Sequence, residues 1–302
     1  MRRTPFALLA LGIVAISSPS AAQERSGRTE RSFTWSERVP RDAWIRVFSP
    51  KGQVEVVEST SDVVEVRGEK RADRGEIEDI EFEVIKDGQN VTICALIVDR
   101  SECDEDGISN RRRSYNDSRY GSVDFTIRVP KGVRIHVGSG NGDVSVTGAG
   151  AEVVASSGNG RVRVATTAGG VSASSGNGEV TVEGATDRVE ARSGNGRVRV
   201  STSLGPVNAS SGNGSIEVSM DRLTDDSDME FHTGNGRVIV TVPADFSAEI
   251  ETSQGSGEFQ TDFPMLVKGR LTPSRVRATI GKGGRRLHMT SGNGDIELRK
   301  RG

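Results

Sequence analysis

The stretch Ser174–Val182 reads Ser-Ser-Gly-Asn-Gly-Glu-Val-Thr-Val, and it decides the fold because the chain repeats it. Its Ser-Gly-Asn-Gly core recurs with asparagines that are each 18 residues apart: Asn141, Asn159, Asn177, Asn195 and Asn213. Looser copies follow at 233–236, 253–257 and 291–294. Such a short and strict period predicts a solenoid in which each repeat forms one coil.

Each repeat reads as strand, tight corner and strand. In one copy, the alternating runs Val171–Ser175 and Val180–Val182 flank Gly-Asn-Gly. Glycine and asparagine tolerate positive φ, so we expect left-handed backbone at the corners. The predicted corner residues are Gly140, Asn141, Gly142, Gly158, Asn159, Gly160, Gly176, Asn177, Gly178, Gly194, Asn195, Gly196, Gly212, Asn213, Gly214, Gly292, Asn293 and Gly294. A unit this short has no room for a helix, which favours a β-solenoid over a propeller blade or a leucine-rich repeat.

Four rows of small apolar residues agree from coil to coil and predict the interior. They are Val153, Val171, Val189 and Val207; Ala155, Ala173, Ala191 and Ala209; Val162, Val180, Val198 and Ile216; and Val164, Val182, Val200 and Val218. The alanine row makes this interior a narrow packed seam rather than a ligand cavity. A composition of 33% hydrophobic and 4% aromatic residues suits a thin core shared between neighbouring coils.

The positions directly after the corners predict that the coils stack in register. They alternate in charge along the chain, as Asp143, Arg161, Glu179, Arg197, Ser215 and Arg237. Parallel coils place such side chains about 4.8 Å apart, where opposite charges attract and like charges repel. The repeated asparagines should likewise form a stacked amide ladder along the corner.

These patterns predict an all-β fold, a single-stranded parallel β-solenoid (β-helix) with coils of about 18 residues, in which right-handed coils are expected. The expected plan is a signal peptide at 1–22, a polar leader or edge cap at 23–43, and a solenoid at 44–302. Within the solenoid we expect irregular coils at 44–137 with a long loop at 99–121, regular coils at 138–257 and closing coils at 258–302.

The amino end predicts export. Arg2 and Arg3 precede an apolar run, Phe6–Ile16, which is too short to span a bilayer, and Ser20-Ala21-Ala22 resembles a cleavage site. No cysteine follows that site, and no apolar stretch near Gly302 offers a second anchor, so we expect a periplasmic or extracellular chain without a transmembrane segment. Cleavage would remove two arginines and change the formal charge from −2 to −4, which argues against nucleic acid as a partner.

Cys94 and Cys103 are the only cysteines in the chain. Two cysteines of an exported protein usually pair, and this bond would tie the base of the 99–121 loop to a strand. The alternative is a buried thiol at Cys94 with a free Cys103.

Three segments carry a family resemblance: Val123–Gly132, the rungs of Ser-Gly-Asn-Gly-x-Val-x-Val, and the closing stretches 280–284 and 290–298. Together they resemble the bacterial "putative adhesin" family of β-strand-repeat proteins over residues 44–298. The resemblance implies a parallel β-helix exported to the cell envelope. It brings no catalytic residues, and the family is a domain of unknown function.

Residues that could carry chemistry have simpler explanations. Calcium-binding repeats place aspartate where this chain has core valines such as Val144 and Val162, so no metal or cofactor is expected. Glu179 and Glu217 share a face about 12 Å apart, but Arg197 and Arg199 stand between them, which favours a neutralised charge ladder over an acid pair. The histidines, His136, His232 and His288, are scattered.

We therefore expect a non-enzymatic cell-envelope or surface interaction scaffold whose partner is a protein or a glycan. The candidate contact residues lie on the long loop: Arg111, Arg112, Arg113, Tyr115 and Tyr120. A solvated flexible loop is the alternative explanation of this cluster. The alternative function is a polysaccharide-active lyase or hydrolase, and the sequence leaves the oligomeric state open.

Overall fold

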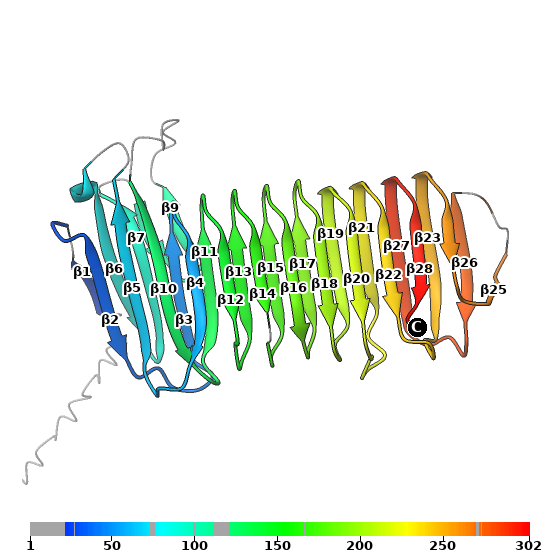
Figure 1. The fold of residues 1–302 in the computed structure, drawn as a ribbon, viewed down its shortest axis with the longest axis horizontal. Helices are drawn as coiled ribbons and strands as arrows, with labels where there is room; N and C mark the ends of the chain where they lie inside the picture. The colour runs from blue at the N-terminus through cyan, green and yellow to red at the C-terminus, as the bar shows by residue number, and fades with distance from the viewer. Residues whose placement is uncertain are drawn as a thin grey trace, which may run out of the picture.

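Two long sheets face each other across a narrow core (Figure 1). The computed structural model describes residues 22–26, 28–72, 76–98, 101–110, 121–165, 167–269, 272 and 274–302. Within these ranges, sheet A has 14 strands and sheet B has 12, and a hairpin of β8 (Ser101–Asp104) and β9 (Gly107–Asn110) forms a third, small sheet. Residues 1–21, which make up all but the last residue of the expected signal peptide, lie outside the described residues.

Each regular coil contributes one strand to each sheet. Sheet A receives β11 (Arg134–Ser139), β13 (Val153–Ser157), β15 (Val171–Ser175), β17 (Val189–Ser193) and β19 (Val207–Asn213). Sheet B receives β12 (Val144–Thr147), β14 (Val162–Ala165), β16 (Val180–Ala185), β18 (Val198–Thr202) and β20 (Ile216–Met220). Val171 lies opposite Val153 on one side and Val189 on the other, all in parallel. The predicted parallel β-solenoid with an 18-residue period is confirmed.

The four predicted apolar rows fill the space between the sheets. Every member of these rows is at most 4% exposed, and they belong to one continuous hydrophobic cluster. Because valine and alanine recur in register, each coil buries its inward side chains against the coils above and below it.

The corner glycines are required for a different reason from the one that the sequence suggests. Gly178 does not have left-handed backbone, so that expectation is wrong for the regular corners and holds only at looser copies such as Gly236 and Gly294. A Cβ added at Gly178 would lie 2.0 Å from the carbonyl oxygen of Gly160 in the preceding coil. The stacked backbones approach so closely that no side chain fits between them.

Two side-chain ladders hold the corners together. Each asparagine donates from Nδ2 to Oδ1 of the asparagine one coil earlier, as Asn177 does to Asn159 at 2.7 Å. The corner serine adds a second rung, because the hydroxyl of Ser175 donates to the carbonyl of Gly160 at 2.8 Å. The serine bond repeats at Ser139, Ser157, Ser193, Ser211 and Ser291, and Thr233 makes the same contact.

The amino end is a mostly antiparallel cap rather than the expected series of irregular coils. One coil, β3 (Trp44–Ser49) and β4 (Val54–Ser59), stacks on β11 and β12. The cap adds β1 (Ala22–Ser26), β2 (Ser32–Glu37), β5 (Val64–Arg71), a 3-10 turn (Ile77–Asp79), β6 (Ile80–Asp87), β7 (Asn90–Ile97) and β10 (Ser122–Pro130). Three phenylalanines fill its wider core, where the Phe82 ring stacks on Phe33 at 4.5 Å and meets Phe125 edge-on at 6.0 Å.

The carboxyl end does not follow the order of the sequence. Its strands are β21 (Met229–Asn235), β22 (Val238–Val242), β23 (Ala248–Ser256), β24 (Phe259–Thr261), β25 (Met265–Val267), β26 (Arg275–Ile280), β27 (Arg286–Asn293) and β28 (Ile296–Lys300). The coil of β27 and β28 lies between the coil of β21 and β22 and the coil of β23 and β24 (Figure 1). The sequence pattern suggests that the closing coils stack in the order in which they occur in the chain, and this expectation is wrong.

Among the described residues, no helix has both the length and the apolar character needed to cross a membrane.

Replacing Gly178 with alanine should destabilise the solenoid by more than about 2 kcal/mol, because the added methyl group overlaps the backbone of the preceding coil. Gly170 is a matched control on another turn, where an added Cβ meets only the carbonyl oxygen of Arg188 at 3.7 Å. Gly170→Ala should cost less than about 1 kcal/mol. Denaturant unfolding of both variants checks this, and equal losses would contradict the close-approach explanation.

Candidate interaction surface

Several outward charges of the regular coils pair with a charge on a neighbouring coil. Arg161 binds Asp143 at 2.8 Å, and Arg199 binds Glu179 at 2.8 Å and Glu217 at 3.4 Å. Although partial burial opposes it, hydrogen bonds from Arg161 lower the pKa of Asp143. The two glutamates considered as an acid pair are thus bridged by one arginine, as the charge-ladder interpretation predicts.

A groove of about 700 Å³ crosses the outer face of sheet A near the carboxyl end. Its lining residues come mainly from β21, β27, β23 and β26. These four strands are neighbours in sheet A (Figure 1). One row of outward side chains runs across it, in the register order Asn208, Glu230, His288, Glu251 and Arg277. The interleaved order of the strands brings these distant parts of the sequence together.

Basic side chains surround the carboxylates of this groove. Arg275 and Arg277 donate to the same oxygen of Glu251 at 2.5 and 2.9 Å, and these hydrogen bonds lower the pKa of Glu251 to about 2. Lys268 binds Glu249 at 2.8 Å and lowers the pKa of that carboxyl as well.

Two further acids of the groove also face basic groups. Arg286 lies 2.6 Å from Asp228, and hydrogen bonds from the Arg286 backbone and side chain lower the pKa of Asp228. Nδ1 of His288 lies 3.8 Å from Glu230. A general acid needs a raised pKa, so the lowered values at Asp228, Glu249 and Glu251 suit polar contact better than proton transfer.

Of the three histidines, His136 lies far along the solenoid from this groove, on β11. His136 packs edge-on against Phe48 at 4.9 Å, and burial, followed by the nearby Arg46, lowers its pKa. His232 and His288 lie on the neighbouring strands β21 and β27, two register positions apart. In the part of the chain that the structure describes, no three His, Cys, Asp or Glu side chains are placed to hold a metal ion.

A disulfide ties the β8–β9 hairpin to the outer face of sheet A. It joins Cys94 on β7 to Cys103 on β8, whose Cα atoms are 6.0 Å apart. Ile108 packs with Phe48, Cys94 and Leu96 beneath the hairpin. The predicted contact residues Arg111, Arg112, Arg113, Tyr115 and Tyr120 lie outside the described residues.

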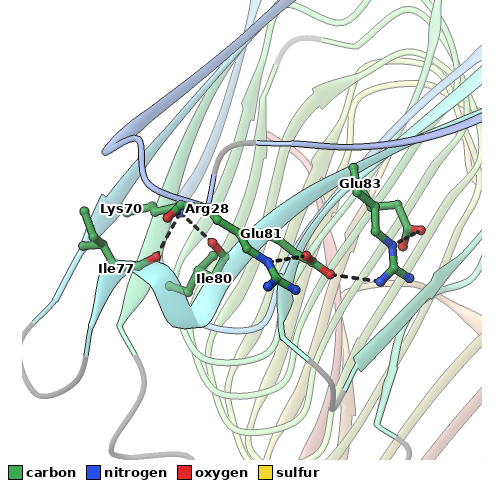
Figure 2. A network of polar contacts seen from close by, with 7 residues as sticks. Arg28, Lys70, Ile77, Ile80, Glu81 and Glu83 are labelled. Atoms are coloured by element: carbon green, nitrogen blue, oxygen red, sulfur yellow. Dashed lines mark hydrogen bonds and ion pairs between the residues drawn. The ribbon is translucent and has the colours of Figure 1, made fainter.

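A buried lysine, Lys70, closes the amino-terminal cap, and it is not among the residues that the sequence pattern predicts to be functional. Lys70 donates to the backbone carbonyls of Arg28, Ile77 and Ile80 at 3.1, 2.9 and 2.5 Å, and burial lowers its pKa (Figure 2). The position of Lys70 in the sequence indicates its burial. Exposed and buried residues alternate strictly along β5, and Lys70 falls on a buried position of that alternation.

Arginines of the amino-terminal segment complete the same network. Arg25 binds Glu81 and Glu83, each at 3.0 Å, and Arg28 binds Glu81 at 3.1 Å (Figure 2). Both glutamates are almost fully buried, so pairing offsets the cost of removing their charge from water. The network fastens the β1 edge to β6 and is structural.

Two facing parallel sheets with a filled core and polar outer faces define this protein as a parallel β-solenoid. Residues 45–299 match the family described as Toastrack DUF4097, and the chain belongs to that family. This membership confirms the resemblance seen in the sequence.

Two solved structures are similar to this chain. A "putative adhesin" from Bacteroides fragilis NCTC 9343 is 14% identical, covers 90% of this chain and 98% of its own, and has a TM-score of 0.47. A "putative cell adhesion protein" from Clostridium sporogenes ATCC 15579 is 9% identical, covers 89% and 100%, and has a TM-score of 0.27. A search of curated proteins found no match.

The depressed pKa of Glu251 predicts a pH-dependent contribution to stability. Its pKa falls from the ordinary 4.5 to about 2, so the contribution is present above pH 4.5 and is lost as the pH falls through about 2. Glu251→Gln should lower stability at pH 7 by under about 1 kcal/mol, since the pair is exposed. Thermal melts should show this difference closing by pH 2, and a constant difference would contradict the assignment.

The disulfide predicts that the purified exported protein has no reactive thiol. Labelling with a maleimide under denaturing, non-reducing conditions should modify no cysteine, whereas prior reduction should expose both Cys94 and Cys103. Two labelled cysteines without reduction would show that the hairpin is not tied to β7.

Proposed function

We propose that this protein is an exported, non-enzymatic β-solenoid that acts as an interaction scaffold at the cell envelope or surface. Its partner on this proposal is an envelope or surface protein or a glycan. The leader-like amino end supports export to the periplasm or the outside of the cell.

One observation carries the proposal: the carboxylates of the sheet A groove and of the regular coils face basic partners. Glu251 has two arginines, Glu249 has a lysine, and Glu179 and Glu217 share Arg199. A polysaccharide hydrolase needs one carboxyl that holds a proton near neutral pH. Lowered pKa values at Glu249 and Glu251 work against that role and leave a rigid, polar, nearly neutral face.

Such a face is suited to recognition over a wide area. Stacked strands position its side chains at fixed intervals, so little conformational entropy is lost when a partner binds. The residues 111–120, with four arginines and two tyrosines, would supply the specific contact, since arginine and tyrosine are enriched among the residues that dominate binding energy.

The test is to replace residues 111–120 with a Gly-Ser linker of equal length, which retains Cys103 and the β8–β9 hairpin. The variant should keep the wild-type circular dichroism and melting temperature and lose at least tenfold in binding to envelope fractions or host-cell surfaces. Asn208→Arg, which places a bulky group in the sheet A groove, is the matched control and should bind like wild type.

Other results would change the proposal in specific ways. Loss of binding only in the Asn208 variant would move the contact from the loop to the groove. Release of reducing or unsaturated ends from any polysaccharide by the wild-type protein would overturn the non-enzymatic function.

A further inference from the structure

The coil of β27 and β28 is inserted between two coils that precede it in the sequence. β27 pairs in parallel with β21 on one side and β23 on the other, and β28 does the same with β22 and β24. Phe231, for example, lies opposite Met289, which in turn lies opposite Thr252. In both sheets the inserted coil therefore separates the two flanking coils.

Specific contacts fit this coil to its place. Leu287, Met289, Ile296 and Leu298 are fully buried between its neighbours. At the corner, Asn293 donates to Asn235 at 2.7 Å and accepts a hydrogen bond from Ser256 at 3.0 Å. The buried apolar residues and the hydrogen bonds of Asn293 together fix the direction, the length and the register of the strand that can occupy this place.

Arginines next to the inserted coil fasten it to an acidic linker, residues 221–228. Arg285 donates to Asp226 at 3.1 Å, and Arg286 binds Asp228 at 2.6 Å. Arg301 binds Asp221. These pairs attach both ends of the inserted coil to the same linker, so the place is specified by charge as well as by shape.

A glycine-rich linker joins the inserted coil to β26. Gly281, Gly283 and Gly284 have φ values of +58°, +76° and +107°, and an added Cβ at Gly284 would meet nothing within 4 Å. Glycine passes readily between such conformations and extended ones. Residues 281–285 can therefore act as a hinge that carries β27 and β28 as one unit.

We propose that the coil of residues 286–300 is exchangeable, and that the same coil of a second copy of this chain can take its place. Without an inserted coil, β21 and β23 would face each other with unpaired backbone groups, which are a template for another strand. The corresponding coil of a second copy satisfies every contact by identity, which is the basis of domain swapping. This inference does not depend on the proposed function.

The experiment uses the full chain with cysteines at Asn235 and Asn293, which are register partners in adjacent parallel strands. If the coil stays in its own chain, Asn235→Cys/Asn293→Cys forms a bond within one chain; if it is exchanged, the bond joins two chains. The matched control is Asn177→Cys/Asn195→Cys in two consecutive regular coils. Refolding over a range of protein concentrations, followed by non-reducing electrophoresis, distinguishes the two.

We expect the 235/293 pair to give at least tenfold more covalent dimer than the 177/195 pair, in a proportion that rises with protein concentration. Deleting Gly283 and Gly284 in the 235/293 protein should raise the dimer further, because a shortened hinge disfavours return of the coil to its own chain. Bonds within single chains only, at all concentrations and with both hinge lengths, would overturn the proposal. Equal dimer from both cysteine pairs would also overturn it, since that result reports random collision.

Discussion

The backbones of successive coils approach each other closely at the corners, and the rest of the solenoid depends on this contact. At each corner, the Cα of the second glycine lies against the carbonyl of the equivalent glycine one coil earlier, where a methyl group would be 2.0 to 2.2 Å from oxygen in the regular coils. This contact fixes the distance between coils and therefore the register of both sheets. Because the register is fixed, asparagine amides and apolar side chains meet their own kind along each row, and each corner serine hydroxyl meets a glycine carbonyl of the preceding coil.

The same register determines the electrostatic character of the outer faces. Side chains one coil apart are close enough to pair, as Arg199 does with Glu179 on one side and Glu217 on the other. Each exposed pair contributes only about 0 to 1 kcal/mol, but a row of alternating charge disfavours slippage by one coil. The resulting surface carries many charged side chains, but acidic and basic groups pair, so its net charge is close to zero. Carboxylates such as Glu251 stay ionised to low pH because their pKa is lowered. These properties favour contact with a partner over acid–base chemistry.

The sequence predicts features that repeat and misses those that depend on order or on single residues. An 18-residue period was enough to place Val171, Val189 and the asparagine ladder, because every coil reports the same register. It could not distinguish close backbone approach from positive φ at Gly178, since glycine satisfies both. Alternating apolar residues read alike in parallel and antiparallel strands, so the cap around Phe82 looked like coils. Lys70 broke the apolar alternation, but only the fold shows the carbonyls that it binds.

The hydrogen bonds of the asparagine ladder all run in one direction, from Asn293 through Asn235 and the regular coils to Asn141. A duplicated 18-residue unit placed among the regular coils would find the same donor on one side and the same acceptor on the other. Such a duplication would lengthen the rod by about 4.8 Å and introduce no new type of contact. Insertion of 17 or 19 residues would instead turn apolar side chains to the outside. Length is thus a trait that this protein can change in whole steps by unequal copying of its gene.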